Sequence, residues 1–515
     1  MLRRTSSLLF ASSLLVAAGC NADRGTALPI DDVTPLAGQL AASGAGFITS
    51  QPAQAEVLVP GAEMWPIISV GDPIPGTNDT WAPTPDGLGA YFEKGVLNVY
   101  TAHELSSSGV RSSNGGPTIA YARVSKLAID PRTRSVLGGS YVEDGSSQLQ
   151  RLCSATWVDG AEGMPTGYFM AGEETLGTPN GSVVSAWDKQ GNKTPLPHLG
   201  AFAHENQIIV PGFKNRVVGV GLDDAGGQSE LYLYVADSEQ GFIQGTGKLY
   251  VFKTDVKSTA GTPLHSGNMV DGQRIPGYFV EVTDPADLST PPAQRAANLQ
   301  NKVDALGAMP FVRIEDGDYD KNSPNTPAIY FVDTGNSSIR GRSQVGADCF
   351  GVCDLAGSLY RLQFERNDPT RAALILMERS KGAASGWASP DNIATTQRSI
   401  MIQEDPAYAG FDGSRPPAIW NLKLVNDGKQ AINPRKVVKA TQETLIPGPG
   451  GKCVDAQGLC WEVTGIISTE KSMGQGSWLF AVQAHTLPFS VTTNGVTSQY
   501  PSENGQLLFL RVPGT

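Results

Sequence analysis

From residue 60 to the C-terminus, short apolar runs alternate with clusters of turn-forming residues, and this alternation limits the possible folds more than any other feature. The runs have the length of strands and are rich in β-branched and aromatic residues, as in residues 96–100, 208–210, 231–235 and 329–332. The chain has 59 Gly and 35 Pro, and only 17% of its residues are charged, so turns are frequent and long charged helices few. The pattern predicts an all-β protein.

A weak repeat indicates the architecture. Residues 247–252 resemble residues 357–362, and residues 505–510 are a degenerate third copy; in each, glycine opens a run of aromatic and aliphatic residues. Such runs are typical of the strands of β-propeller blades. An insertion at about residues 290–308 has apolar residues at helical spacing and predicts the longest helix. We therefore expect residues 55–515 to form a single large β-propeller with long loop insertions and a few short helices.

The first 20 residues predict an export signal. Arg3 and Arg4 form its charged region, and residues 8–18 form an apolar core that is too short to span a bilayer. The arginine pair is compatible with twin-arginine export as well as with the general secretory route.

The end of this signal leaves two modes of cleavage open. Residues 16–20 resemble a lipoprotein cleavage box with Cys20 as the lipidated residue, and ordinary cleavage near Ala22 is the alternative. Residues 21–54 are rich in Ala, Gly, Pro and Ser and predict a flexible tether. We expect an exported protein that is periplasmic, anchored to the outer membrane or extracellular, with membrane contact only through an N-terminal lipid.

The formal net charge of −11 bears on possible partners. An acidic chain is a poor candidate for binding a nucleic-acid backbone, so we expect no nucleic acid as a specific partner. Carboxylates gathered around metal ions would account for part of the excess negative charge. We expect a monomer.

The cysteines divide into two close pairs and one odd residue. Cys349 and Cys353, and likewise Cys453 and Cys460, are spaced for small-loop disulfides in an exported protein. Cys153 is then the odd thiol. It is either a small buried apolar residue or a thiolate ligand of a transition metal.

Acidic motifs recur beside the strand-like runs. Taken singly, each is compatible with a surface ion pair or a turn. Loops at one end of a propeller converge on its central channel, however, so that scattered carboxylates can build one polynuclear metal site. The motifs are His103-Glu104, Glu173-Glu174, His204-Glu205, Asp223-Asp224, Glu315-Asp316, Ser389-Pro390-Asp391-Asn392-Ile393 and Gln403-Glu404-Asp405.

With these motifs in this order, the chain resembles the PhoX-type alkaline phosphatases from about residue 60 to residue 512. The most specific elements are Cys153 followed by the two glutamates, and the Pro-Asp-Asn element at residues 390–392. Residues 121–126, 202–205 and 313–316 and the first His-Glu pair support the resemblance.

The resemblance implies a β-propeller that holds iron and calcium in its central channel. Cys153 would be an iron ligand, and Arg313 would contact phosphate through its planar guanidinium. We also expect Asn392 to contact the substrate. The implied carboxylate ligands are Glu174, Glu205 and Glu315 near iron or calcium, and Asp391, Glu104, Asp223 and Glu404 around calcium.

Two departures from the family pattern affect the site. Ile314 follows Arg313 where the family usually has proline, and residues 159–163 lengthen the segment between Cys153 and the glutamate pair. The sequence leaves open whether Glu173 or Glu174 is the ligand.

The expected activity is hydrolysis of phosphate monoesters, with a possible extension to diesters, at the metal site. Two other functions fit the same pattern. One is a calcium-stabilised extracellular propeller that serves as a binding or adhesion module. The other is a metal-dependent lactonase or esterase on the same architecture.

Overall fold

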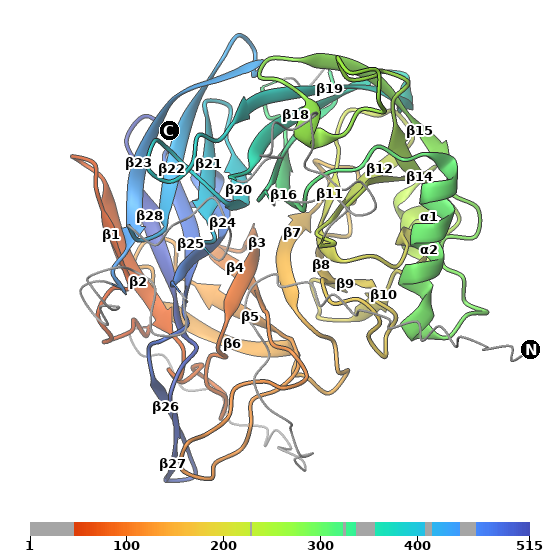
Figure 1. Cartoon of the computed structure of the whole chain (residues 1–515). Helices are drawn as coiled ribbons and strands as arrows, with labels where there is room; N and C mark the ends of the chain where they lie inside the picture. Colours follow the sequence, from red (N-terminus) through yellow and green to blue (C-terminus); the bar gives the residue numbers. More distant parts are fainter. Residues whose placement is uncertain (1–45, 227–228, 323–325, 336–355, 407–414, 443–459) are drawn as a thin grey trace, which may run out of the picture.

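The computed structural model describes residues 46–226, 229–322, 326–335, 356–406, 415–442 and 460–515. Five antiparallel sheets form a ring of six blades in these residues, which Figure 1 shows from a view close to the ring axis. Four of these sheets form one blade each and the nine-stranded sheet forms two, and the first strand of each blade lies nearest the axis. The fold is a β-propeller, so the predicted fold class is confirmed.

The first two blades are four-stranded and each follows chain order. The first blade contains β3 (Pro85–Glu93), β4 (Val96–His103), β5 (Arg123–Ile129) and β6 (Val136–Glu143). The second contains β7 (Leu152–Val158), β8 (Tyr168–Glu173), β9 (Val184–Asp188) and β10 (Lys193–Pro195).

The third and fourth blades are joined edge to edge into one nine-stranded sheet, because β15 pairs with β19. The third blade contains β11 (His204–Ile209), β12 (Val217–Asp223), β13 (Leu231–Ala236), β14 (Lys248–Lys253) and β15 (Arg274–Glu281). The fourth contains β16 (Ile314–Tyr319), β17 (Ala328–Asp333), β18 (Ser358–Glu365) and β19 (Asp368–Arg379).

Both ends of the chain complete the last two blades. The fifth contains β20 (Pro390–Thr395), β21 (Ser399–Glu404), β22 (Ala418–Val425), β23 (Gln430–Ala440) and β1 (Ala55–Val57). The sixth contains β24 (Glu462–Ser468), β25 (Ser477–Ala484), β28 (Asn504–Arg511) and β2 (Glu63–Ser69). An N-terminal strand thus closes the ring against C-terminal strands.

Residues 46–54 lie against the propeller, although the sequence places them in a tether. Phe47 forms a β-bridge with Val136 of the first blade, and the backbone N–H of Gln54 donates to the side chain of Gln506 in the sixth. Contacts with the propeller therefore begin before the predicted boundary at residue 55.

Few helices decorate the ring. α2 (Pro292–Leu306) is the longest helix in the described ranges, as the sequence predicts for residues 290–308, and it lies at the periphery. α1 (Glu239–Gln244), α4 (Glu470–Met473) and the 3₁₀ turns η1 (Pro197–Leu199) and η2 (Ser266–Asn268) are short. No helix in the described part of the chain has the length and apolar character that a membrane span requires.

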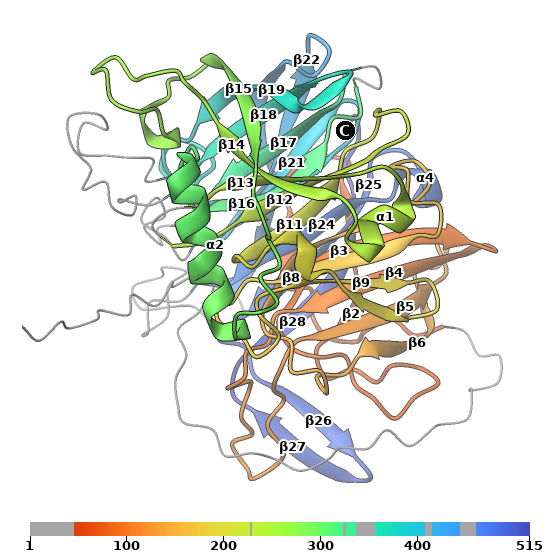
Figure 2. The ribbon, with the colours of Figure 1, turned by 90° about the vertical axis from the view of Figure 1, so that its right-hand side faces the viewer.

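A hairpin of β26 (Phe489–Thr493) and β27 (Val496–Tyr500) projects from the sixth blade (Figure 2). Its turn is Asn494-Gly495, with φ angles of 53° and 78°. Two left-handed residues form the tight turn that matches the twist of the two strands.

Apolar side chains fill the space between adjacent blades. Tyr100 of the first blade stacks on Trp157 and Phe169 of the second, with ring centroids 5.5 Å and 5.1 Å apart. Since blades pack face to face through such contacts, the inner strands are held in fixed positions around the channel.

The two predicted disulfides stay predictions. Cys460 is disulfide-bonded, but Cys349, Cys353 and Cys453 lie outside the described residues, as does the predicted lipidation site Cys20. Cys153 carries a buried thiol.

Candidate active site

A β-bulge recurs at the start of the innermost strand in five of the blades. In β3, for example, Pro85 pairs with His103 and Leu88 with Thr101, so that Asp86 and Gly87 together face one residue of β4. Such a bulge redirects a side chain out of the regular pleat. The first bulged residues of the five strands, called here the bulge residues, are Asp86, Cys153, Glu205, Glu315 and Asp391.

The residue before the strand has a left-handed backbone in four of these blades. The φ angles are 49° at Thr84, 49° at Arg151, 55° at Arg313 and 47° at Ser389. The next residue is proline in the first and fifth blades, but Ile314 in the fourth. Because Arg313 has nearly the same φ angle as Thr84 and Ser389, isoleucine at this position keeps the same turn as proline.

The bulge residues and their neighbours bring metal-binding atoms together. Three overlapping groups have ligand atoms within 4.8 Å of one another. The groups are Asp86, Glu104 and Cys153; Cys153, Glu174 and Glu205; and Glu205, Glu315 and Asp391. Since Cys153 and Glu205 each belong to two groups, the three form one continuous cluster across the channel.

The cluster is buried and tightly packed. The Sγ atom of Cys153 lies 3.4 Å from Oδ2 of Asp86. A Cβ atom at Gly87 would lie 2.4 Å from the carbonyl oxygen of Cys153, so only glycine allows β3 and β7 to approach so closely. Gln483 donates to both Asp86 and Glu104, at 3.1 Å each, and fixes these two carboxylates relative to one another.

Adjacent acidic residues at the end of the second strand have divided roles. In each pair, such as Glu173-Glu174 or Asp223-Asp224, the backbone N–H of the second residue donates to the carbonyl oxygen of the residue that precedes the innermost strand. Glu174 donates to Arg151 at 2.9 Å, and Asp224 donates to Ala203 at 2.9 Å. Glu174 belongs to the cluster, and Asp224 forms an ion pair with Arg313 at 2.6 Å. The second members thus lie at the channel.

The first members hold the blade's own loops instead. Glu173 accepts from Thr178 Oγ1 at 2.8 Å and from the backbone N–H of Gln150 at 3.1 Å. These contacts leave Glu174, rather than Glu173, as the member within ligand distance of Cys153.

Two carboxylates that the sequence assigns to calcium are first members. Asp223 accepts from the backbone N–H groups of Ala225 and Glu230, at 3.1 Å and 3.3 Å. Glu404 accepts two bonds of 2.6 Å from Arg415 and also those of two backbone N–H groups. Neither belongs to the three ligand groups of the described residues, whereas the other six predicted ligands do.

Burial and mutual repulsion raise the pKa values of these carboxyl groups. Burial raises the pKa of Asp86 to about 7, with the charge of Glu174 adding to the effect. Burial, followed by the charge of Glu315, holds the pKa of Asp391 well above its usual range. Both carboxylate oxygens of Asp391 have no hydrogen-bond partner among the described residues. Buried acids of this kind need a cation, so the donor set fits metal ions.

Arg313 lies beside the ligand groups, and its predicted contact with phosphate stays a prediction. Its Nη2 atom lies 2.6 Å from Oδ2 of Asp224 and 3.1 Å from Oε1 of Glu315, and its side chain is 3% exposed. Burial raises the pKa of Asp224 to about 7 even though the Arg313 charge lowers it.

Asn392 follows Asp391 and links the fifth blade to the second and the sixth. Its amide donates to Ser154 Oγ, on the innermost strand of the second blade, and its oxygen accepts from Thr464 Oγ1 at 3.0 Å and from the N–H of Gly465 at 2.8 Å. The substrate contact expected for Asn392 stays a prediction.

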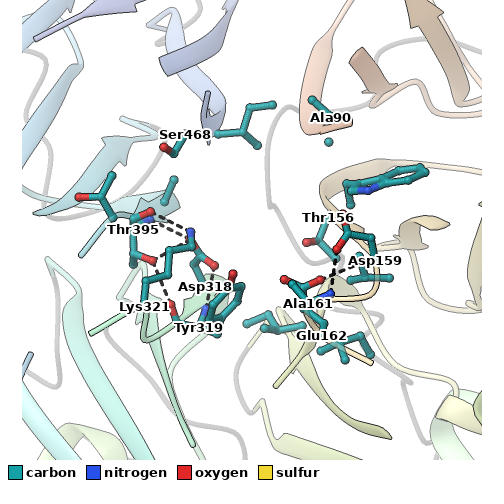
Figure 3. Close-up of a pocket in the computed structure, with 18 of the residues that line it drawn as sticks. Ala90, Thr156, Asp159, Ala161, Glu162, Asp318, Tyr319, Lys321, Thr395 and Ser468 are labelled. Atoms are coloured by element: carbon teal, nitrogen blue, oxygen red, sulfur yellow. Dashed lines mark hydrogen bonds and ion pairs between the residues drawn. The ribbon is translucent and has the colours of Figure 1, made fainter. Parts of the chain in front are cut away.

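A cavity of about 850 Å³ lies at the opposite end of the channel. Figure 3 shows two sides of it: Asp318, Lys321 and Thr395 on one, and Asp159 and Glu162 on the other. These residues belong to the far ends of the inner strands or follow them, and the Asn392–Ser154 bond lies between them and the cluster. None of the residues in the three ligand groups lines this cavity.

Three residues of the site were not predicted from the sequence as ligands or substrate contacts: Asp86, Arg151 and Asp224. A signal for Asp86 exists, since Thr84-Pro85-Asp86-Gly87-Leu88 has the pattern of Ser389-Pro390-Asp391-Asn392-Ile393. The fold and this cluster together define a β-propeller with a buried acidic channel whose donor set fits metal ions.

Comparison with known proteins agrees with this class. Residues 183–412 match the model of the family described as alkaline phosphatase PhoX. This match confirms the resemblance drawn from the motifs to the PhoX-type alkaline phosphatases and supports a phosphoric ester hydrolase. No curated protein matches the chain as a relative.

Solved structures agree with the fold. The chain is similar to Pseudomonas fluorescens PhoX in complex with vanadate, with a TM-score of 0.61 and 13% identity over 90% of this chain and 97% of that one. At this identity the likeness establishes the fold. The Neurospora crassa Pan2 WD40 domain is more distant, with a TM-score of 0.35 and 9% identity over 88% of this chain and 96% of that one, and we draw nothing from it.

Proposed function

We propose that the protein is an exported phosphatase that hydrolyses phosphate monoesters, and to a lesser extent diesters, at a polynuclear site of iron and calcium. The observation that carries the proposal is the continuous cluster of Cys153 with six carboxylates in one buried channel. Carboxylate oxygens alone suit calcium, whereas a thiolate suits a transition metal. A binding module stabilised by calcium alone would have no use for this thiol.

The residues would divide between two kinds of metal ion. Cys153 lies where two ligand groups overlap, so it would hold iron together with carboxylates such as Glu174 and Glu205. Glu104 and Asp391 lie at the two ends of the cluster, where oxygen ligands dominate and calcium fits best. When bound, such ions polarise phosphoryl oxygens and activate water.

The chain itself contributes orientation and charge. Arg313 is held by Asp224 and Glu315, so its guanidinium is fixed before a substrate arrives. A fixed planar cation stabilises the equatorial oxygens of a phosphoryl group without reorganisation. The Asn392–Ser154 bond spans the channel beside the cluster, and we expect a phosphate ester to enter from the opposite end of the channel.

The proposal is tested by assaying the purified, fully metallated protein on a broad panel of phosphate monoesters and diesters. We expect hydrolysis of monoesters that is lost on strong chelation and returns when iron and calcium are restored. Hydrolysis of lactones or carboxylic esters without any phosphate ester in the panel would contradict the proposal. So would the absence of any hydrolysis.

A further inference from the structure

Arg151 occupies in the second blade the position that Arg313 occupies in the fourth. Each immediately precedes an innermost strand, with φ angles of 49° and 55°. Each also accepts a backbone hydrogen bond at its carbonyl from the second strand, from Glu174 at 2.9 Å and from Thr334 at 3.1 Å. The repeat of the fold therefore places two arginines at equivalent points around one channel.

Both guanidinium groups contact the carboxylates of the cluster. Nη2 of Arg151 lies 2.9 Å from Oε1 of Glu104 and 2.8 Å from Oε2 of Glu174. Arg313 contacts Asp224 and Glu315 in the same way. The two arginines thus contact four acidic side chains of the same channel.

The two arginines differ in their exposure. The side chain of Arg151 is 15% exposed, whereas that of Arg313 is 3% exposed. Arg151 is thus accessible to a ligand that enters the channel, and Arg313 forms the deeper contact. A guanidinium carries five N–H donors in a planar fork, so it can hold a carboxylate on one edge and a phosphate on another.

We propose that Arg151 is a second phosphate-binding residue and that, with Arg313, it makes the site selective for monoesters over diesters. This inference rests on the proposed phosphatase function. A monoester phosphate carries about two negative charges near neutral pH and three terminal oxygens. A diester carries one charge and two such oxygens, so a second arginine has less to bind. Arg151 therefore stabilises bound monoesters more than bound diesters.

The test is Arg151→Lys, which keeps the positive charge but removes the planar fork. Arg415→Lys is the matched control, because Arg415 is also 15% exposed and also pairs with a carboxylate, that of Glu404, which lies outside the ligand groups. Three quantities are measured for each protein: binding of inorganic phosphate by calorimetry, iron and calcium content, and kcat/KM for p-nitrophenyl phosphate and bis(p-nitrophenyl) phosphate.

We expect Arg151→Lys to keep its metals and to bind phosphate at least about tenfold more weakly, the effect of one charge-assisted hydrogen bond. Its monoester-to-diester ratio of kcat/KM should fall by a similar factor, and Arg415→Lys should match the wild type. Unchanged phosphate binding, or loss of metal from Arg151→Lys, would overturn the inference; the second result would assign Arg151 to holding ligands. Failure of the phosphatase proposal is distinct, because the wild type itself would then hydrolyse no phosphate ester.

Discussion

Replacement of Arg313 by lysine tests how the site uses a fixed cation. Arg313 contacts two carboxylates through one nitrogen, Asp224 at 2.6 Å and Glu315 at 3.1 Å, and its side chain is 3% exposed. Lysine keeps the charge on a single nitrogen, so it can hold these carboxylates but offers no planar fork to phosphate oxygens. We expect Arg313→Lys to bind metal and to hydrolyse monoesters slowly.

The size of the loss follows from the contact that disappears. A hydrogen bond to a charged group contributes about 1.5–3 kcal/mol. Each 1.36 kcal/mol is a factor of ten in rate, so kcat/KM should fall about 10- to 100-fold. Because the interaction stabilises developing charge on the phosphoryl oxygens, kcat should fall along with kcat/KM.

The assay is steady-state hydrolysis of p-nitrophenyl phosphate by protein of known metal content. Arg361→Lys is the control for the cost of changing a buried arginine, since Arg361 pairs with Asp320 at 2.7 Å and is 1% exposed but lies outside the cluster. We expect both variants to lose stability and only Arg313→Lys to lose activity. A fully metallated Arg313→Lys protein with the wild-type kcat/KM would refute the reasoning.

Three further predictions concern the cluster. Burial raises the pKa of Asp86 and of Asp224 from 3.8 to about 7, so the folded metal-free protein binds more protons than the unfolded chain between these pH values. The melting temperature of the metal-free protein should therefore fall as the pH rises from about 4 to about 8. A flat or rising profile would refute this. Cys153→Ala should lose iron and activity but keep its circular dichroism spectrum. Unchanged hydrolysis would show that Cys153 is a buried apolar residue and not a metal ligand. Glu174→Gln should lose metal, whereas Glu173→Gln should only lower the melting temperature; the reverse pattern would contradict their divided roles.

Much of the fold was predictable because local patterns determine strands. Residues 231–235 and 329–332 lie in β13 and β17, and the helical spacing at residues 290–308 corresponds to α2. The repeat was less informative. Residues 247–252 lie at the fourth strand of a blade, whereas residues 357–362 lie at the third, so their likeness reflects strand chemistry and not equivalent places in the blade.

The site was harder to predict because its geometry depends on backbone bulges and pairing register. A doublet such as Asp223-Asp224 looks symmetric in sequence, yet adjacent residues of a strand point in opposite directions. The first member holds its own loop through the N–H groups of Ala225 and Glu230, and the second reaches Arg313. The choice between Asp223 and Asp224 therefore follows from strand pairing, which composition and motif spacing do not reveal.

The central claim is that the buried channel holds iron and calcium together. Elemental analysis of the purified, exported protein tests it most directly, because the result does not depend on guessing the natural substrate. We predict iron and calcium in the same preparation, with iron lost from Cys153→Ala. Calcium alone in a folded protein that is fully active on phosphate esters would contradict the iron assignment, and the absence of both metals from active protein would contradict the metal centre itself.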